Sequence, residues 1–187
     1  MQLPEIQERI RNGEDSTTQF KRDVTDANRL AEEMVAFANA QGGVLLIGVD
    51  DDGLVSGLDD AQISRLNQLI SNTASENVKP PIYPLTELLE IQGKRLMVVN
   101  IRRGEARPYQ TSKGIYFTKS GSDKRRMSPE ELRRLFAETA RLFADEEVLP
   151  RTDITDLNAE AFMIFCRLMT PLFMKNSSRA SCSWTPC

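Results

Sequence analysis

The chain has 187 residues, of which 40% are hydrophobic and 27% charged, so it is long enough for one well-filled core and has an ordinary globular composition. It contains no histidine, which excludes Ser-His-Asp and Cys-His nucleophilic sites, HExxH zinc sites and any histidine general base. The net charge of −3 gives no overall attraction to nucleic acid, yet residues 102–126 carry eight Lys or Arg against two acids.

The three cysteines, Cys166, Cys182 and Cys187, lie near the C-terminus and form no CxxC pair. This distribution argues against a disulfide framework or a structural zinc site, and it favours a reducing compartment. The first residues carry charges where a signal peptide needs an apolar run, and every apolar run is too short to span a membrane. The sequence therefore predicts a cytoplasmic protein with no membrane partner.

Hydrophobic periodicity and helix-capping residues predict helices that alternate with short strands. In the first half we expect a helix at 4–12, an extended segment at 14–23, a helix at 26–40 capped by Asp26, a strand at 44–49, a turn at 50–53, a short returning strand at 54–58 and a helix at 59–72. In the second half we expect a hairpin of 82–91 with 95–101, a strand at 114–119 and a helix that Ser128 caps and that runs to about Phe143.

These elements predict one α+β domain over residues 1–145, with packed helices and a mixed, largely antiparallel sheet. The charged ADEE segment and Pro150 mark a domain boundary. Residues 146–187 are expected to be a linker and the start of a truncated second region, with a disordered polar tail.

The adjacent glycines Gly42 and Gly43 do not fit a phosphate-binding loop. Such a loop precedes a helix, so that the free N–H groups of the helix face the phosphate, whereas this pair follows the helix at 26–40. We expect Gly42 to adopt the left-handed conformation that ends a helix, with the chain turning directly into a core strand.

The three aspartates of DDDG have two interpretations. An EF-hand loop with its glycine at Gly53 would need an acid where Gly48 stands, so that motif is excluded. The simpler interpretation is a hairpin turn, since Asp-Gly suits one well. The alternative is a divalent-metal site in which Asp50 or Asp51 joins Glu14.

Five stretches resemble, in order, the Schlafen AlbA-like domain family, which is also labelled "divergent AAA". They are EDSTTQFK, AFANAQGGVLLIGVDDDGLVSG, VKPPI, GKRLMVVNIRRGEARPY and GIYFTKSGSDKRRMSPEEL, and they span about residues 14–135. The family occurs in bacterial transcriptional regulators, in RecG-helicase-related proteins and in the animal Schlafens. The resemblance implies an AlbA-like fold and a role in nucleic-acid binding, and it implies no ATPase activity, since the sequence has no phosphate loop.

The resemblance also carries over an acidic site from the Schlafens that act as RNases. By position its first acid falls on Glu14 and its third on Asp51, or on Asp50 if the alignment slips by one residue, while the second falls on Gln19. An amide can coordinate a metal but brings no negative charge. Two carboxylates could still hold one Mg²⁺ or Mn²⁺, with Lys21 steadying a phosphate, but the incomplete acid set argues against hydrolysis.

The basic segment offers the residues that would bind nucleic acid. Lys and Arg on strands and loops can follow a phosphate backbone, and nearby aromatic rings such as Tyr109, Tyr116 and Phe117 can stack on an unpaired base. Strand alternation puts Tyr116 and Phe117 on opposite faces, so that one of them belongs to the core. The loop SGSDKRR is expected to be flexible and rich in free amides. The predicted contacts are Arg102, Arg103, Arg107, Lys113, Lys119, Lys124, Arg125 and Arg126.

The sequence thus predicts a module that binds DNA or RNA, DNA before RNA, in a transcriptional regulator or a RecG-related protein, without catalysis and without a required cofactor. Two alternatives stay open. One is a nuclease that uses Glu14, Asp51 and Lys21 with Mg²⁺ or Mn²⁺. The other is a protein–protein interaction or dimerisation module, in which an exposed sheet edge forms a homodimer.

Overall fold

The computed structural model describes residues 3–140 together with Asn158 and Glu160. The chain divides into two units, Met1–Ala144 and Asp145–Cys187, and the helices and strands named below belong to the first. Apart from Asn158 and Glu160, the predicted second region at 146–187 lies outside the described residues, as do all three cysteines. Its linker, its truncation and its disordered tail stay predictions.

The helices follow the predicted order, with one addition. They are α1 (Leu3–Asn12), α2 (Ala27–Asn39), α3 (Asp60–Asn72), the π-helical turn η1 (Thr73–Asn77) that continues α3, and α4 (Pro129–Ala140). Within the described part of the chain, none of them is long and apolar enough to cross a membrane.

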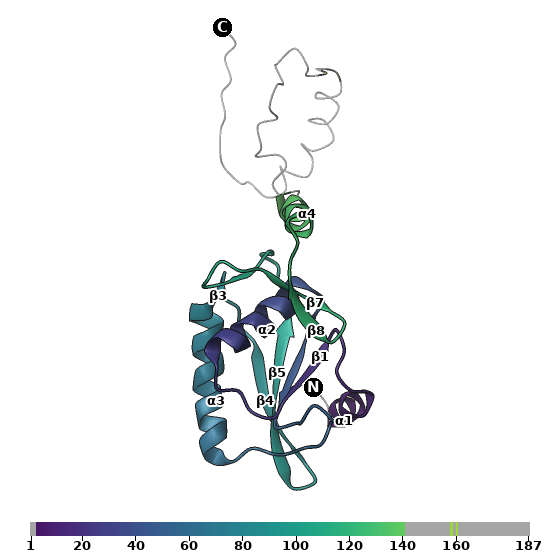
Figure 1. The fold of residues 1–187 in the computed structure, drawn as a ribbon, viewed down its shortest axis with the longest axis vertical. Helices are drawn as coiled ribbons and strands as arrows, with labels where there is room; N and C mark the ends of the chain where they lie inside the picture. The colour runs from purple at the N-terminus through teal and green to yellow at the C-terminus, as the bar shows by residue number, and fades with distance from the viewer. Residues whose placement is uncertain (1–2, 141–157, 159, 161–187) are drawn as a thin grey trace, which may run out of the picture. The chain divides into compact units, whose positions relative to one another are not determined.

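The strands form one sheet and two small ribbons (Figure 1). The sheet has the order β1-β2-β5-β4, in which β1 (Thr18–Lys21) runs parallel to β2 (Gly42–Ile47), while β5 (Lys94–Arg102) runs antiparallel to β2 and to β4 (Leu85–Ile91). The ribbons are β3 (Val78–Lys79) with β6 (Gln110–Thr111), and β7 (Phe117–Ser120) with β8 (Asp123–Arg126). The predicted α+β class with a mixed, largely antiparallel sheet is confirmed.

Both faces of the central strands are buried, which explains the unbroken apolar run VLLI. Leu45 and Ile47 of β2 face a core that α2 and α3 cover, and Val44 and Leu46 face a second core that includes Ile6 of α1. Figure 1 shows α2 and α3 stacked on one side of the sheet and α1 beside β1. The two cores fix the strand register, because a shift by one residue would exchange their side chains.

The two glycines at the end of α2 have different functions. Gly42 has a φ of +80°, the left-handed conformation expected of it. Gly43 is required by space, since a Cβ there would lie 2.4 Å from the Phe37 ring and 2.7 Å from the carbonyl oxygen of Thr17. The pair therefore turns the chain closely from helix to sheet, as predicted.

Local signals at the ends of elements were also predicted correctly. Asp26 caps α2 by accepting the N–H groups of Asn28 and Arg29. Ser128 and Glu131 exchange hydrogen bonds as a capping box at the start of α4. The DDDG segment turns back on itself, since the N–H of Gly53 donates to the carbonyl of Asp50 at 2.9 Å.

Three expectations need correction. Residues 120–126 do not form a flexible, amide-rich loop: a tight turn leads into β8, whose backbone pairs with β7. The returning strand expected at 54–58 is reduced to one bridge between Val49 and Val55, and the strand expected at 114–119 begins only at Phe117. In each case the pairing partner, which propensity does not specify, decided the extent of the strand.

Candidate functional site

Glu14 binds the open edge of the sheet. It lies before β1, and its Oε1 accepts the backbone N–H of Phe20 at 2.7 Å and the side-chain amide of Gln19. Since β1 is an edge strand, the carboxylate satisfies a donor that the sheet leaves free. The first two positions of the expected acidic site thus lie in contact, with Gln19 donating to Glu14.

Gln19 continues into a buried polar network. Its Oε1 accepts from Lys119 Nζ at 2.7 Å, and Lys119 lies 3.9 Å from Glu33 Oε2 of α2. The side chain of Lys119 is 1% exposed, its ammonium is 4.8 Å from the centre of the Phe37 ring, and burial lowers its pKa although Glu33 and Glu14 oppose this. The network therefore joins β1, α2 and β7 inside the molecule.

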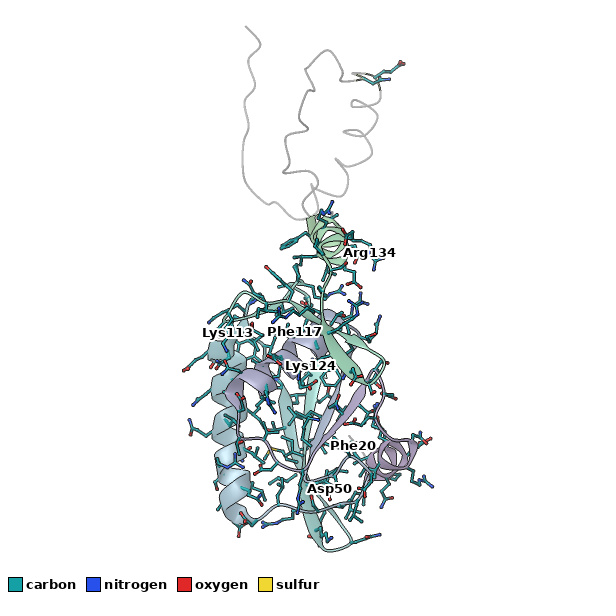
Figure 2. The ribbon with its side chains drawn as sticks, viewed as in Figure 1. Phe20, Asp50, Lys113, Phe117, Lys124 and Arg134 are labelled. Atoms are coloured by element: carbon teal, nitrogen blue, oxygen red, sulfur yellow. The ribbon has the colours of Figure 1, made fainter. Side chains whose placement is uncertain are left out.

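The third acidic position lies in the turn that follows β2. Asp51 is exposed in this turn, and Asp50 lies 3.7 Å from the guanidinium of Arg22. Figure 2 shows Asp50 far from Lys124 and Lys113, towards the other end of the sheet. Among the residues that the structure describes, no group of three His, Cys, Asp or Glu side chains could hold a metal ion. A site for Mg²⁺ or Mn²⁺ at Glu14, Asp50 and Asp51 stays a prediction.

Lys21 points its Nζ at the carbonyl oxygen of Phe20, 2.7 Å away, and it also lines a pocket of about 370 Å³ together with Glu33 and Lys124. The pocket carries both signs of charge, because Arg29 and Asp26 line it as well. Lys21 is thus close to the buried network, but no ion pair of Lys21 with Glu14 is formed in the described part of the chain.

The eight basic residues fall into two groups, and three of them form intramolecular ion pairs. Lys119 is buried in the network already described. Lys124 Nζ lies 2.9 Å from Glu33 Oε1, because Lys124 pairs with Lys119 in the ribbon and both side chains face α2. Arg125, on the outer face, binds Glu131 with both terminal nitrogens. These contacts hold the ribbon to α2 and to the start of α4.

The hydrogen bonding of Glu131 by Arg125 also changes the pKa of Glu131. It is the main cause that lowers the pKa of Glu131 to about 2, and the N–H of Ser128 adds to the effect. Glu131 therefore stays ionised at any ordinary pH, and its charge is already matched within the structure.

The other five basic residues form no ion pair with any residue between 3 and 140. They are Arg102, Arg103, Arg107, Lys113 and Arg126. Four of them are exposed, and only Arg107 is half-buried. Lys119, in contrast, is enclosed by protein and is not part of the exposed surface.

The aromatic residues of the segment are mostly structural. Tyr109 and Phe117 are buried in the core, which agrees with the expectation that one of Tyr116 and Phe117 is internal. Tyr116 packs edge-on against Phe136 of α4, with ring centres 6.3 Å apart. Base stacking by these rings stays a prediction.

Asn39 positions the basic segment, and sequence reasoning missed it. Its side-chain amide donates to the carbonyls of Tyr109 and Phe117 at 2.8 and 2.9 Å, and its Oδ1 accepts the N–H of Tyr109 at 2.7 Å. One buried side chain thus joins the end of α2 to the chain on both sides of Lys113. The available signal was a polar residue one turn after Val35, on the apolar face of the helix that Ala31 and Val35 share.

Comparison with known proteins gives one family match. The sequence model of the family described as "Schlafen, AlbA_2" matches residues 14–128. No curated protein matches the chain.

Two solved structures are similar to this chain. The DIP2311 protein from Corynebacterium diphtheriae has 19% identity over 87% of this chain, with a TM-score of 0.48, and the chain spans only 31% of that protein. The N-terminal domain of a RecG-related protein from Nitrosomonas europaea has 22% identity over 66% of this chain and 92% of its own, with a TM-score of 0.45.

Proposed function

Since the chain belongs to the Schlafen, AlbA_2 family, we propose that it is a nucleic-acid-binding module, with DNA as its ligand, of a transcriptional regulator or a RecG-related protein. The observation that carries the proposal is the group of five basic residues between 102 and 126 that have no ion pair within residues 3–140. Unpaired cations on a surface are the groups that can exchange their hydration for phosphate oxygens.

The proposed contact surface consists of the exposed residues Arg102, Arg103, Lys113 and Arg126 and the half-buried Arg107. Asn39 holds together the segments that carry them, so the charges lie on a fixed framework. Lys and Arg contacts of this kind position a phosphate backbone without reading its sequence. We therefore expect tight but sequence-tolerant binding that depends strongly on salt.

The test is fluorescence anisotropy of a labelled DNA duplex at low and moderate salt, with an RNA hairpin as competitor. For the triple variant Arg102→Gln, Lys113→Gln and Arg126→Gln we expect affinity at low salt to fall by about tenfold or more. The dependence of log K on log salt should lose about one unit of slope for each contact removed. A DNA preference predicts that the RNA hairpin competes poorly.

The matched control removes the same charge elsewhere. Arg11, Arg22 and Arg29 are exposed and lie outside the basic segment, so the variant Arg11→Gln, Arg22→Gln and Arg29→Gln should bind as the parent does. An equal loss in both triple variants would mean that only net charge matters, and it would contradict the proposed surface. Wild-type protein that does not bind at low salt would overturn the proposal altogether.

The two alternative functions stay hypotheses with tests of their own. For the nuclease, the variant Gln19→Glu restores the missing acid next to Glu14, and absence of cleavage by either form with Mn²⁺ would exclude it. For the homodimer, β4 is the other edge of the sheet and exposes Leu85 and Leu88. A monomer mass by light scattering at high protein concentration would exclude that association.

A further inference from the structure

A small pocket lies between the end of α2, the outer face of the β7–β8 ribbon and α4, with a volume of about 250 Å³. Three arginines line it: Arg103 and Arg107 from the segment after β5, and Arg134 from α4. Thr118 of β7 is also in its wall. Arginines from two separated parts of the chain thus converge on one small volume.

The acids of the pocket neutralise only part of this charge. Glu131 is bound to Arg125, which lies outside the pocket wall, and Glu138 lies 3.8 Å from Arg134. Arg103 and Arg107 form no ion pair with any other side chain that the structure describes. Two guanidiniums at the pocket therefore have no ion pair, although Glu138 attracts Arg107 from beyond ion-pair distance.

Arg107 also has a buried hydrogen-bond donor, its Nε, without a partner among the described residues. Burial lowers the pKa of Arg107 and the nearby positive charge of Arg103 lowers it further, whereas Glu138 and Tyr109 oppose this shift. A guanidinium keeps its proton under all ordinary conditions, so the donor and the repulsion persist until an anion compensates them.

We infer that this pocket binds the terminal phosphate of a nucleic-acid strand, with Arg103 and Arg107 donating to its oxygens. A phosphomonoester carries a charge of about −1.5 to −2 at neutral pH, which matches two unpaired guanidiniums, whereas a phosphodiester within the strand carries a single charge. The planar guanidinium donates two parallel hydrogen bonds to such a group. The volume is below the ~300–1,000 Å³ of sites that enclose whole small molecules, so it suits one terminal group.

This inference rests on the proposed function, because it assigns one part of the nucleic acid, the terminal phosphate, to one part of the protein surface, this pocket. The two can still be tested apart, since the three residues changed in the test above do not line the pocket. The probes are oligonucleotides of one sequence that end in either a phosphate or a hydroxyl, with the dye at the opposite end.

The wild-type protein should bind the phosphorylated strand about tenfold more tightly than the hydroxyl strand, a difference of about 1.4 kcal/mol. The variant Arg103→Gln and Arg107→Gln should bind the two strands with equal affinity, whatever affinity for the hydroxyl strand it retains. The control variant Arg11→Gln and Arg29→Gln should keep the preference. Equal wild-type affinities for the two strands would overturn the inference and leave the proposed function standing.

If neither strand binds, the proposed function fails, and inorganic phosphate then tests the pocket by itself. Millimolar phosphate should raise the melting temperature of the wild-type protein above that in chloride of the same ionic strength, and the Arg103→Gln and Arg107→Gln variant should show no rise. Such a result would show that the pocket binds phosphate, but that this phosphate does not belong to a nucleic-acid strand. If the melting temperature of the wild-type protein does not rise, the phosphate site is overturned together with the proposed function.

Discussion

Asn39 is one buried side chain that three backbone groups depend on, two carbonyls and one N–H. We expect Asn39→Ala to lower the free energy of unfolding by about 2–4 kcal/mol, because these groups stay buried without their partner. Asn28→Ala, the same change at an exposed position of the same helix, is the control and should cost far less. Urea unfolding measures both, and equal losses would show that Asn39 contributes only its helix propensity.

The β7–β8 ribbon is held to α2 by Glu33, which lies next to two lysines, Lys119 and Lys124. We expect Glu33→Gln to cost roughly 3–5 kcal/mol, because it leaves the buried ammonium of Lys119 without its carboxylate. Glu32→Gln is the matched control: Glu32 lies 3.5 Å from Lys124 and is 30% exposed, so its loss should cost about 1 kcal/mol or less. Denaturant unfolding compares them, and a Glu33→Gln variant as stable as Glu32→Gln would mean that the ribbon is held by its apolar contacts alone.

Stability against acid is a property of the whole molecule, set by every carboxyl whose pKa is lower in the folded chain. Arg125 lowers the pKa of Glu131 to about 2, and the N–H of Asn28 lowers that of Asp26. The unfolded chain then binds more protons below about pH 4.5, so the stability from these groups is complete above that value and is lost as pH falls towards about 2.

We therefore expect the urea midpoint of the wild-type protein to exceed that of Glu131→Gln at neutral pH, and the gap to close on acidification to about pH 2. Glu130→Gln, at an exposed acid in the same helical turn, should follow the wild type throughout. A gap that is constant with pH would show that the bond to Arg125 adds nothing to stability.

Local elements were predictable wherever neighbouring residues fix the backbone. Asp26 and Ser128 mark helix starts through their caps, and Gly42 marks a helix end through its left-handed φ. Glu33 was predictable in principle, because it stands three residues after Leu30 and four before Phe37, on the apolar face of its helix. A charged residue at such a position is buried only with a partner, and that partner, Lys119, is 86 residues away along the chain.

The basic segment shows the limit of prediction from charge. From the sequence, the eight cations of this segment are equivalent candidates for binding. In the structure, Lys119 and Lys124 face inwards to Glu33, whereas Arg126 is exposed and has no ion pair within residues 3–140. This division depends on the register of β7 with β8 and on the position of α2. Neither is encoded within the segment itself.

By itself, the sequence determined the family resemblance, the α+β class, most elements and the turn at Gly42 and Gly43, because each depends on residues close together in the chain. Only the tertiary structure decided which cations are already matched, how Asn39 joins distant segments, and that Arg103, Arg107 and Arg134 converge on one pocket. The physical reason is that ion pairing and burial are set by distances in space. Residues far apart in sequence reach those distances only when the sheet, the ribbon and the helices have packed.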